Sequence, residues 1–274
     1  MKVSYDYSGK IAAVIGSATG IGHAMAIEFA KAGATVIVCD YNEEKGKETV
    51  ELAKEAGAPN AAFYPINTTD TESVNKAKES IIKDFGRVDC LFVNAGVSAA
   101  VDQLGPPLCG IAIDDFKRLF EVNFFGTLRV LQAFEPVFMA QKKGKIVVTA
   151  SISAHMVNPT MPQYSASKRA IINLVQSTSK ELGAFNVNIN ILNPGFVYTP
   201  MYQNGGMAFK NKFPDRFATE NDPEAIMKKL ASQSVFGRPQ TPQDMANAVL
   251  WLCSEGSSEI TGQELNVDSG IIRR

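Results

Sequence analysis

Residues 11–32 read IAAVIGSATGIGHAMAIEFAKA and combine three features in order. The apolar run Ile11 to Ile15 is typical of a buried strand, and residues 21–32 carry apolar side chains at helical spacing. Between these two segments lies a turn that contains Gly16, Gly20 and Gly22. The stretch therefore predicts a strand, a glycine-rich turn and a helix, which together begin a strand-helix-strand unit.

A glycine-rich turn at the start of a helix suits an anion. Glycine permits unusual backbone angles and a close approach by a ligand, while the N–H groups and dipole of the helix attract negative charge. We expect a dinucleotide diphosphate here, with contacts from Gly16, Ser17, Thr19, Gly20, Ile21 and Gly22. A tight connection without any ligand is the alternative for a glycine pattern taken alone.

The next predicted strand, Ala34 to Cys39, is followed by Asp40, eighteen residues after the last glycine of the turn. A carboxylate at this distance can accept hydrogen bonds from both hydroxyls of an adenosine ribose, and it would repel a 2′-phosphate. No compensating arginine or lysine stands at Ser17, Thr19 or Tyr41. The pattern predicts NAD rather than NADP, unless Asp40 only caps the helix expected at residues 42–56.

Strand-like and helix-like segments alternate along the rest of the chain. Further strands are predicted at residues 61–65, 88–93, 145–150 and 187–192, and amphipathic stretches such as 71–85 separate them. This alternation is typical of an α/β fold with a doubly wound parallel sheet and helices on both faces. No segment resembles a linker, so residues 1–274 are interpreted as a single domain.

Ligands of doubly wound sheets bind beyond the carboxyl ends of the strands. The residues that follow the predicted strands are therefore candidate site residues. Those expected to contact the cofactor are Asn67, Thr68, Asn94, Ala95, Gly96, Pro194, Gly195, Val197 and Thr199. Tyr41, Tyr164 and Lys168 are also expected to contact it. Ser151 follows the fifth predicted strand.

Composition excludes several function classes. Hydrophobic residues make up 45% of the chain, charged residues 20%, and the net charge of −1 gives no electrostatic reason to bind nucleic acid. No apolar run is long enough to span a membrane, and the first ten residues lack the apolar core of a signal peptide, so we expect a cytoplasmic protein. Four scattered cysteines are expected to be buried free thiols, and the two histidines have no metal-ligand spacing, so no metal is expected.

Along nearly its whole length the chain resembles the short-chain dehydrogenase/reductase family. The motifs that carry the resemblance are Gly16-x-x-x-Gly20-Ile-Gly22, Asn94-Ala-Gly96, Asn123, Ser151, Tyr164-x-x-x-Lys168, Asn193-Pro-Gly195 with Thr199, Thr261-Gly-Gln and Val267-Asp-Ser-Gly270. Each motif alone is weak, but the ordered set is highly specific. The resemblance implies a Rossmann fold, a nicotinamide cofactor and a small-molecule alcohol or ketone as substrate.

Two positions depart from the family pattern. Ile15 stands where the family usually has a threonine before the first glycine, which removes a hydroxyl that can brace the turn against Asn94-Ala-Gly96. Asn67 stands where the family usually has an aspartate that reaches the adenine amino group. Since an asparagine carbonyl can still accept that hydrogen bond, we expect weakened adenine binding at most.

Tyr164 and Lys168 lie four residues apart in a segment, residues 163–182, that we expect to be helical, so both side chains share one face. Oxidation of a secondary alcohol needs a base near the hydroxyl proton while hydride leaves the carbon. The phenol of Tyr164 can serve if the Lys168 ammonium and the positive charge of a nearby cofactor lower its pKa from about 10 toward the working pH. Lys168 can also reach the nicotinamide ribose. A surface pair on a helix is the alternative.

The remaining catalytic assignments rest on the resemblance. It implies that Ser151, thirteen residues before Tyr164, binds the substrate oxygen, and that Asn123 orders a water between Lys168 and solvent. Ser153 could substitute for Ser151, and Asn123 could be only a polar residue inside a helix. Thr199 is expected at the nicotinamide carboxamide, with helix capping as its alternative.

The resemblance implies that two segments determine the substrate, residues 97–112 and about 198–236, and both are long. The second is rich in Met, Phe and Tyr, which favours a cover over a bulky cyclic secondary alcohol or ketone such as a hydroxysteroid, unless these side chains only pack the cover or an interface. A polyol, a sugar alcohol or a 3-oxoacyl substrate remains open. Expected substrate contacts are Ser151, Ser153, His155, Tyr164, Met201 and Tyr202.

Two further expectations concern assembly and the loss of catalysis. The resemblance implies a homotetramer or dimer, formed by the helices around Asn123 and Tyr164 and by the C-terminal region. A nucleotide-sensing protein that has lost catalysis is the other class of function. Because Asn123, Ser151, Tyr164 and Lys168 are all present, the enzyme is preferred.

Overall fold

The computed structural model describes residues 4–273 and contains one seven-stranded sheet. Its strands run in the order β3-β2-β1-β4-β5-β6-β7, and every neighbouring pair is parallel. The strands are β1 (Ile11–Ile15), β2 (Thr35–Asp40), β3 (Ala61–Pro65), β4 (Cys90–Val93), β5 (Gly144–Thr149), β6 (Val187–Pro194) and β7 (Glu264–Val267). The order reverses at β1 and β4, where a doubly wound sheet binds its ligand.

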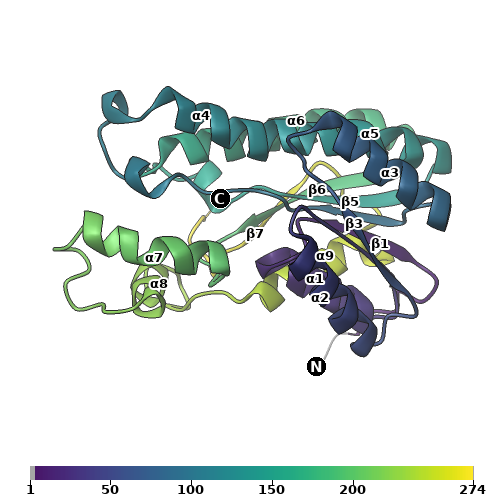
Figure 1. Cartoon of the computed structure of the whole chain (residues 1–274), viewed down its shortest axis with the longest axis horizontal. Helices are drawn as coiled ribbons and strands as arrows, with labels where there is room; N and C mark the ends of the chain where they lie inside the picture. Colours follow the sequence, from purple (N-terminus) through teal and green to yellow (C-terminus); the bar gives the residue numbers. More distant parts are fainter. Residues whose placement is uncertain (1–3, 274) are drawn as a thin grey trace.

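Helices cover both faces of the sheet (Figure 1). One face carries α3 (Thr71–Phe85), α5 (Gly126–Gln141) and α6 (Pro162–Gly183), with α4 (Ile113–Leu119) preceding α5. The other face carries α1 (Gly20–Lys31), α2 (Glu43–Glu55) and α9 (Pro242–Cys253). The predicted α/β class and its doubly wound parallel sheet are confirmed.

The alternation of side chains along β1 explains why the sheet needs both layers. Ile11, Ala13 and Ile15 belong to the core on one side, whereas Ala12 and Val14 belong to the core on the other. All five are buried. A strand that is apolar on both faces is stable only when helices exclude water from both.

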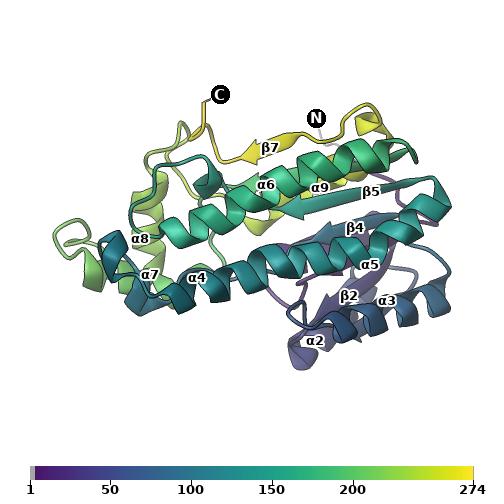
Figure 2. The same ribbon diagram turned by 90° about the horizontal axis from the view of Figure 1, so that it is seen from above.

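Residues 198–236 lie beyond the carboxyl ends of the strands and are mainly helical (Figure 2). They contain α7 (Pro200–Lys212) and α8 (Pro223–Ala231), which pack against each other. Figure 2 also shows α5 and α6 running side by side across one face of the sheet. The segment therefore stands at the edge where the site residues were expected.

The structure also bears on membrane-spanning helices, metal-binding groups and the cysteines. Within residues 4–273, no helix is both long and apolar enough to cross a membrane. Over the same residues, no group of three or more His, Cys, Asp or Glu side chains could hold a metal ion. Cys39, Cys90 and Cys253 are buried free thiols, as expected, but Cys109 is exposed, because it lies in the surface segment that follows β4.

Candidate active site

The turn between β1 and α1 depends on its glycines. Gly16 has φ +82°, and a Cβ there would lie 2.6 Å from the backbone nitrogen of Ala95. A Cβ on Gly22 would lie 2.0 Å from the carbonyl oxygen of Gly16. At Gly20, with φ +61°, the nearest atom would be a methyl carbon of Thr199 at 3.5 Å. Gly16 therefore packs tightly against the segment after β4, and Gly22 packs tightly against the start of the turn itself. Gly20 faces the loop after β6.

The first turn of α1 is suited to a diphosphate. Thr19 occupies the N-cap position, yet its side chain makes no capping hydrogen bond, and the first turn contains no acidic residue. By contrast, side chains cap α2, α3, α8 and α9. An uncapped helix start leaves N–H groups available to an anion, so the residues present fit a dinucleotide.

Ser17 was expected to contact the cofactor, but its hydroxyl faces inward. It donates to the carbonyl of Val14 at 2.8 Å and accepts from the N–H of Cys39 at 3.0 Å. The side chain is fully buried. Ser17 thus ties the turn to β1 and β2, because this interior position offers the hydroxyl two backbone partners.

Asp40 lies at the end of β2 and faces the glycine turn. Its carboxylate accepts from the N–H of Ala18 and from the N–H of Asn42, both at 2.9 Å. The cap of α2 is Asn42, whose side chain accepts from the N–H of Lys45, so the capping alternative for Asp40 is wrong. Each carboxylate oxygen retains a lone pair for a ribose hydroxyl. Tyr41, next in sequence, is 83% exposed.

Asn67 does not offer its oxygen in the way that the sequence suggested. Its Oδ1 accepts from both the N–H and the hydroxyl of Thr69, at 3.1 and 2.8 Å. A carbonyl oxygen has two lone pairs, and both are used within this turn. Thr68 is buried, and its side chain faces Gly126.

Asn94, after β4, braces the glycine turn directly. Its Nδ2 donates to the carbonyl of Gly16 at 3.1 Å, and its Oδ1 accepts from the hydroxyl of Thr149 at 3.1 Å. The backbone N–H of Asn94 also donates to the carbonyl of Ile15 at 3.0 Å. These contacts hold the turn without the hydroxyl that Ile15 lacks.

The end of β6 approaches the same turn from the other side. Gly195 donates its N–H to Val267 of β7 at 3.0 Å, and a Cβ at Gly195 would lie 2.4 Å from the side-chain oxygen of Gln240. Thr199 occupies the N-cap position of α7, but its hydroxyl makes no capping bond. That hydroxyl therefore remains suited to a carboxamide. Pro194 and Val197 are buried in this connection.

Tyr164 and Lys168 share one face of α6, as predicted. The Lys168 Nζ lies 5.9 Å from the centre of the Tyr164 ring and donates to the carbonyl of Thr149 at 3.1 Å. A Cβ on Gly96 would lie 3.2 Å from that Nζ and 3.1 Å from the Oδ1 of Asn123. Gly96, in the segment after β4 that is expected to contact the cofactor, therefore lies against the side chains of both Lys168 and Asn123.

Asn123 is fully buried in a π-helical turn, Phe120–Phe125, between α4 and α5. Its Oδ1 accepts from the N–H of Val97 at 2.8 Å, and its Nδ2 donates to the carbonyl of Val97 and the hydroxyl of Ser167, both at 3.0 Å. A π-helical turn interrupts the regular helix and often marks a functional position. Asn123 therefore links the segment after β4 to α6.

Burial sets the pKa values of the two ionisable residues. It lowers the pKa of Lys168 to about 8. Burial also raises the pKa of Tyr164, and a hydrogen bond with the Ser151 hydroxyl acts in the opposite direction. In the chain by itself, desolvation of the phenolate outweighs the hydrogen bond with Ser151. The expected lowering of the tyrosine pKa also depends on the positive charge of the nicotinamide, so it stays a prediction.

Ser151 follows β5 and opens a short 3₁₀ turn, Ile152–Ala154. The Ser151 hydroxyl oxygen accepts from the N–H of Ser153 at 3.1 Å. This leaves the hydroxyl proton for another acceptor. Ser153 thus supports Ser151 through its backbone N–H.

The other predicted substrate residues differ in availability. His155 bonds through Nε2 to Glu264 and through Nδ1 to Arg169, so its ring has no free nitrogen for a substrate. Met201 is 49% exposed on α7. The ring of Tyr202 stacks on Phe209, and its buried hydroxyl has no hydrogen-bond partner in the described part of the chain.

Sequence reasoning missed the partners that hold these residues. Glu264, on the edge strand β7, contacts His155 from a position 109 residues away in the chain. Gln163, directly before Tyr164, is buried and donates to the carboxylate of Asp115 at 3.0 Å. No local sequence signal predicts either pair, since both depend on how distant elements pack.

Comparisons with known proteins agree with this geometry. A family model described as Enoyl-(Acyl carrier protein) reductase matches residues 16–272. The chain is 32% identical to a 3-oxoacyl-acyl-carrier-protein reductase of Thermotoga maritima, over 96% of this chain and 98% of that protein. It is 32% identical to sorbose reductase of Candida albicans, over 97% and 88%.

A solved structure extends the comparison to three dimensions. Carveol dehydrogenase from Mycobacterium avium, in complex with NAD, superposes with a TM-score of 0.89 at 26% identity, covering 98% of this chain and 99% of that one. The match includes the whole sheet and both helical layers. The chain belongs to the short-chain dehydrogenase/reductase family and is a nicotinamide-dependent oxidoreductase that acts on CH–OH groups.

Proposed function

We propose that this protein interconverts a secondary alcohol and a ketone with NAD(H), and that Tyr164 transfers the proton. The observation that carries the proposal is the meeting of Tyr164, Lys168, Ser151 and Asn123 beyond the carboxyl ends of β4 and β5. When bound, the nicotinamide supplies the hydride acceptor or donor. The glycine turn would hold the diphosphate, Asp40 the adenosine ribose and Thr199 the carboxamide.

Each catalytic side chain has a distinct task. Ser151 donates a hydrogen bond from its hydroxyl to the substrate oxygen and keeps its proton, while its own oxygen accepts from the N–H of Ser153. Tyr164 removes the proton of the alcohol, or returns it to the ketone in the reverse direction. Lys168 carries positive charge at neutral pH, since its pKa of about 8 lies above it, and it favours the phenolate of Tyr164. Asn123 holds the backbone of Val97 and the hydroxyl of Ser167 next to Lys168, and it would order a water that connects Lys168 to solvent.

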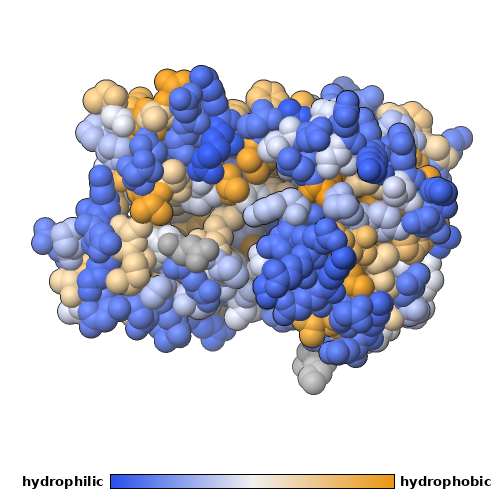
Figure 3. All heavy atoms as spheres, viewed as in Figure 1, coloured by the Kyte–Doolittle hydropathy of each residue, from blue (hydrophilic) through white to orange (hydrophobic). Residues whose placement is uncertain are grey.

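We further propose a bulky cyclic substrate, with a hydroxysteroid as the leading example. Apolar residues gather along a hollow between the α7–α8 segment and the layer above it (Figure 3). Exposed apolar side chains from three segments support this substrate class: Val101, Leu108, Val157, Met201 and Met207. The similarity to carveol dehydrogenase supports it as well.

Part of the aromatic content of residues 198–236 serves packing instead. Phe217 is fully buried with Ile226 and Leu230, and Phe209 and Phe213 pack against them. The exposed methionines of this segment, Met201 and Met207, are the proposed ligand contacts. The similarities to a sorbose reductase and a 3-oxoacyl-acyl-carrier-protein reductase support a sugar alcohol and a 3-oxoacyl thioester as second candidates.

A substrate panel tests the proposal. We expect NAD reduction with hydroxysteroids or simple cyclic alcohols to exceed that with sugar alcohols, and NADH oxidation with cyclic ketones to exceed that with a 3-oxoacyl thioester. Fluorescence of NADH measures each rate, and the Tyr164→Phe variant gives the background rate that does not depend on the proposed proton transfer. If a sugar alcohol or a thioester is turned over faster than the cyclic compounds, the exposed methionines serve packing and the proposal of a cyclic substrate is wrong.

NAD is the proposed cofactor because a carboxylate stands at the ribose position. Replacing Asp40 by serine should reduce the preference for NADH over NADPH, in kcat/KM, by about 10- to 100-fold, since a hydrogen bond to a charged group contributes roughly 1.5–3 kcal/mol. The change also removes the acceptor for the N–H groups of Ala18 and Asn42. We therefore expect weaker binding of both cofactors.

Glu44→Gln is the matched control for the cofactor test. Glu44 is an exposed acid in the first turn of α2, close in sequence to Asp40 but without a contact to the glycine turn. Its removal should leave the preference unchanged. An unaltered preference in Asp40→Ser would show that the carboxylate does not reach the ribose.

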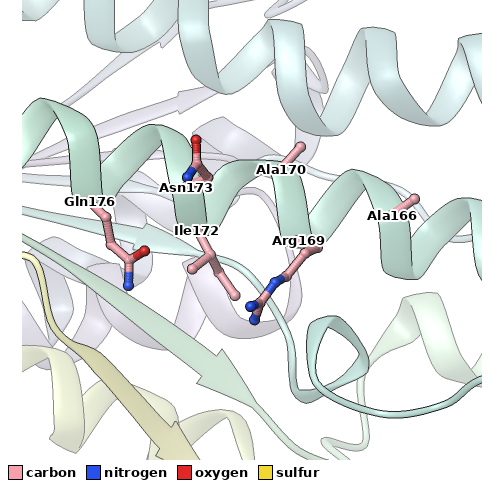
Figure 4. A pocket seen from close by; sticks show the side chains of 6 residues that line it. All are labelled: Ala166, Arg169, Ala170, Ile172, Asn173 and Gln176. Atoms are coloured by element: carbon pink, nitrogen blue, oxygen red, sulfur yellow. The ribbon is translucent and has the colours of Figure 1, made fainter.

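A cytoplasmic homotetramer is the proposed assembly. Small side chains on α6, Ala166 and Ala170, line a surface pocket together with Arg169 and Asn173 (Figure 4). Such a surface lets another helix approach closely. This supports an interface between copies along α6.

A further inference from the structure

A polar network connects the segment after β5 to the edge strand β7. Its members are His155 in the segment after β5, Arg169 and Gln176 on α6, Asn193 on β6 and Glu264 on β7. Asn193 is fully buried, and the side chains of His155 and Glu264 are 10% and 22% exposed. Figure 4 shows Arg169 and Gln176 extending from the same side of α6.

The chemistry of the partners determines the proton positions. An arginine N–H can only donate, so Nδ1 of His155 accepts from Arg169, at 3.0 Å. The Nε2–H of His155 then donates to one oxygen of Glu264, which also accepts from the Nδ2 of Asn193 at 3.0 Å. The other oxygen of Glu264 accepts from Gln176 at 3.4 Å. The network thus holds one orientation of the imidazole.

His155 is coupled to Ser151 by the short 3₁₀ turn between them. The N–H of Ala154 donates to the carbonyl of Ser151 at 3.0 Å. The N–H of His155 donates to the carbonyl of Ile152 at 2.9 Å. Ser151 starts this turn and His155 ends it. Glu264 therefore fixes one end of the turn, while β5 fixes the other.

We propose that His155 and Glu264 are positioning residues for Ser151: they hold the 3₁₀ turn so that the Ser151 hydroxyl faces Tyr164 and the substrate oxygen. The inference rests on the proposed role of Ser151. It extends the site by two residues that do not touch the reacting atoms. A displacement on the order of 1 Å at a reacting group can reduce turnover by about 100-fold, so such support matters for catalysis.

Variants of Glu264 separate positioning from simple stability. Glu264→Ala should lower kcat by roughly 10- to 100-fold, with little change in the dissociation constant for NADH. Glu264→Gln should restore most of kcat, because its side-chain oxygen can still accept from His155 and Asn193. His155→Phe, which keeps the ring volume but removes both bonds, should behave like Glu264→Ala. Thermal unfolding reports the folded fraction of each variant.

The matched control is Glu259→Ala, which removes an exposed acid shortly before β7. Its kcat should equal that of the unmodified protein. A loss of stability in Glu264→Ala with unchanged kcat per folded molecule would overturn the inference. So would a Glu264→Gln variant as slow as Glu264→Ala.

A double variant tests whether the network acts through Ser151. Adding Glu264→Ala to Ser151→Ala should cause no further loss of kcat, whereas multiplied losses would place the effect elsewhere and overturn the inference. If Ser151→Ala alone keeps full turnover, the proposed function fails at Ser151 itself. A crystal structure of Glu264→Ala needs no substrate: residues 151–155 should shift while β5 stays, and an unmoved turn would contradict positioning.

Discussion

Replacing Tyr164 by phenylalanine should lower kcat by about 100- to 10,000-fold, the range that a positioned proton-transfer group contributes. This corresponds to roughly 3–5 kcal/mol of transition-state stabilisation. The substitution removes only the hydroxyl, so the ring keeps its place on α6 beside Lys168. NADH binding should change by no more than about twofold, because the phenyl ring, Lys168 and the other proposed cofactor contacts are retained.

Steady-state rates and NADH titration monitored by fluorescence measure the two quantities. Tyr64→Phe provides the control, since Tyr64 lies on the edge strand β3, three strands away from β4, and its hydroxyl donates to Asp84. It should retain full turnover. Turnover that survives in Tyr164→Phe would eliminate the tyrosine as the proton-transfer group and reopen the class of nucleotide-binding proteins without catalysis.

Gly22→Ala should prevent productive cofactor binding. The new methyl group would lie 2.0 Å from the carbonyl oxygen of Gly16 and 3.0 Å from the Nδ2 of Asn94. The first atom belongs to the turn that is proposed to hold the diphosphate. The second is the amide nitrogen of the side chain that braces this turn, and its hydrogen bonds to Gly16 and Thr149 keep it in place. Overpacking of this kind costs about 1–3 kcal/mol of stability or more. We expect NADH affinity to fall at least tenfold and the midpoint of thermal unfolding to decrease.

Gly183→Ala supplies the comparison for this second prediction. A Cβ at Gly183, the last residue of α6, would have no neighbouring atom within 4 Å. The same chemical change there should leave both affinity and stability close to those of the unmodified protein. Equal effects in the two variants would show that the steric clash at Gly22 does not matter.

Local patterns predicted most of the fold. The strands at residues 11–15 and 61–65 and the helix at 71–85 have the predicted bounds, because apolar runs and helical periodicity report burial directly. The helix of Tyr164 was predicted within one residue at each end. Other strand ends shifted by one or two residues, since strand ends depend on pairing with neighbours rather than on composition.

Contacts between distant residues account for what could not be predicted. The oxygen of Asn67 is used by Thr69, and the ring of His155 by Glu264 and Arg169. The direction in which the pKa of Tyr164 shifts depends on burial, and the spacing of residues in the sequence does not reveal burial. Family resemblance suggested the residue roles in the site, and those roles remain predictions. The packing around each residue came only from the structure.

The order of the strands has a consequence for the growing chain. β1, β2 and β3 are neighbours in the sheet and end at residue 65, while every later strand adds on the β4 side in chain order. During synthesis the glycine turn and Asp40 can therefore assemble before Ser151, Tyr164 and Lys168 have left the ribosome. The half of the molecule proposed to hold adenosine is built first, and the catalytic half is added to an edge that is already formed.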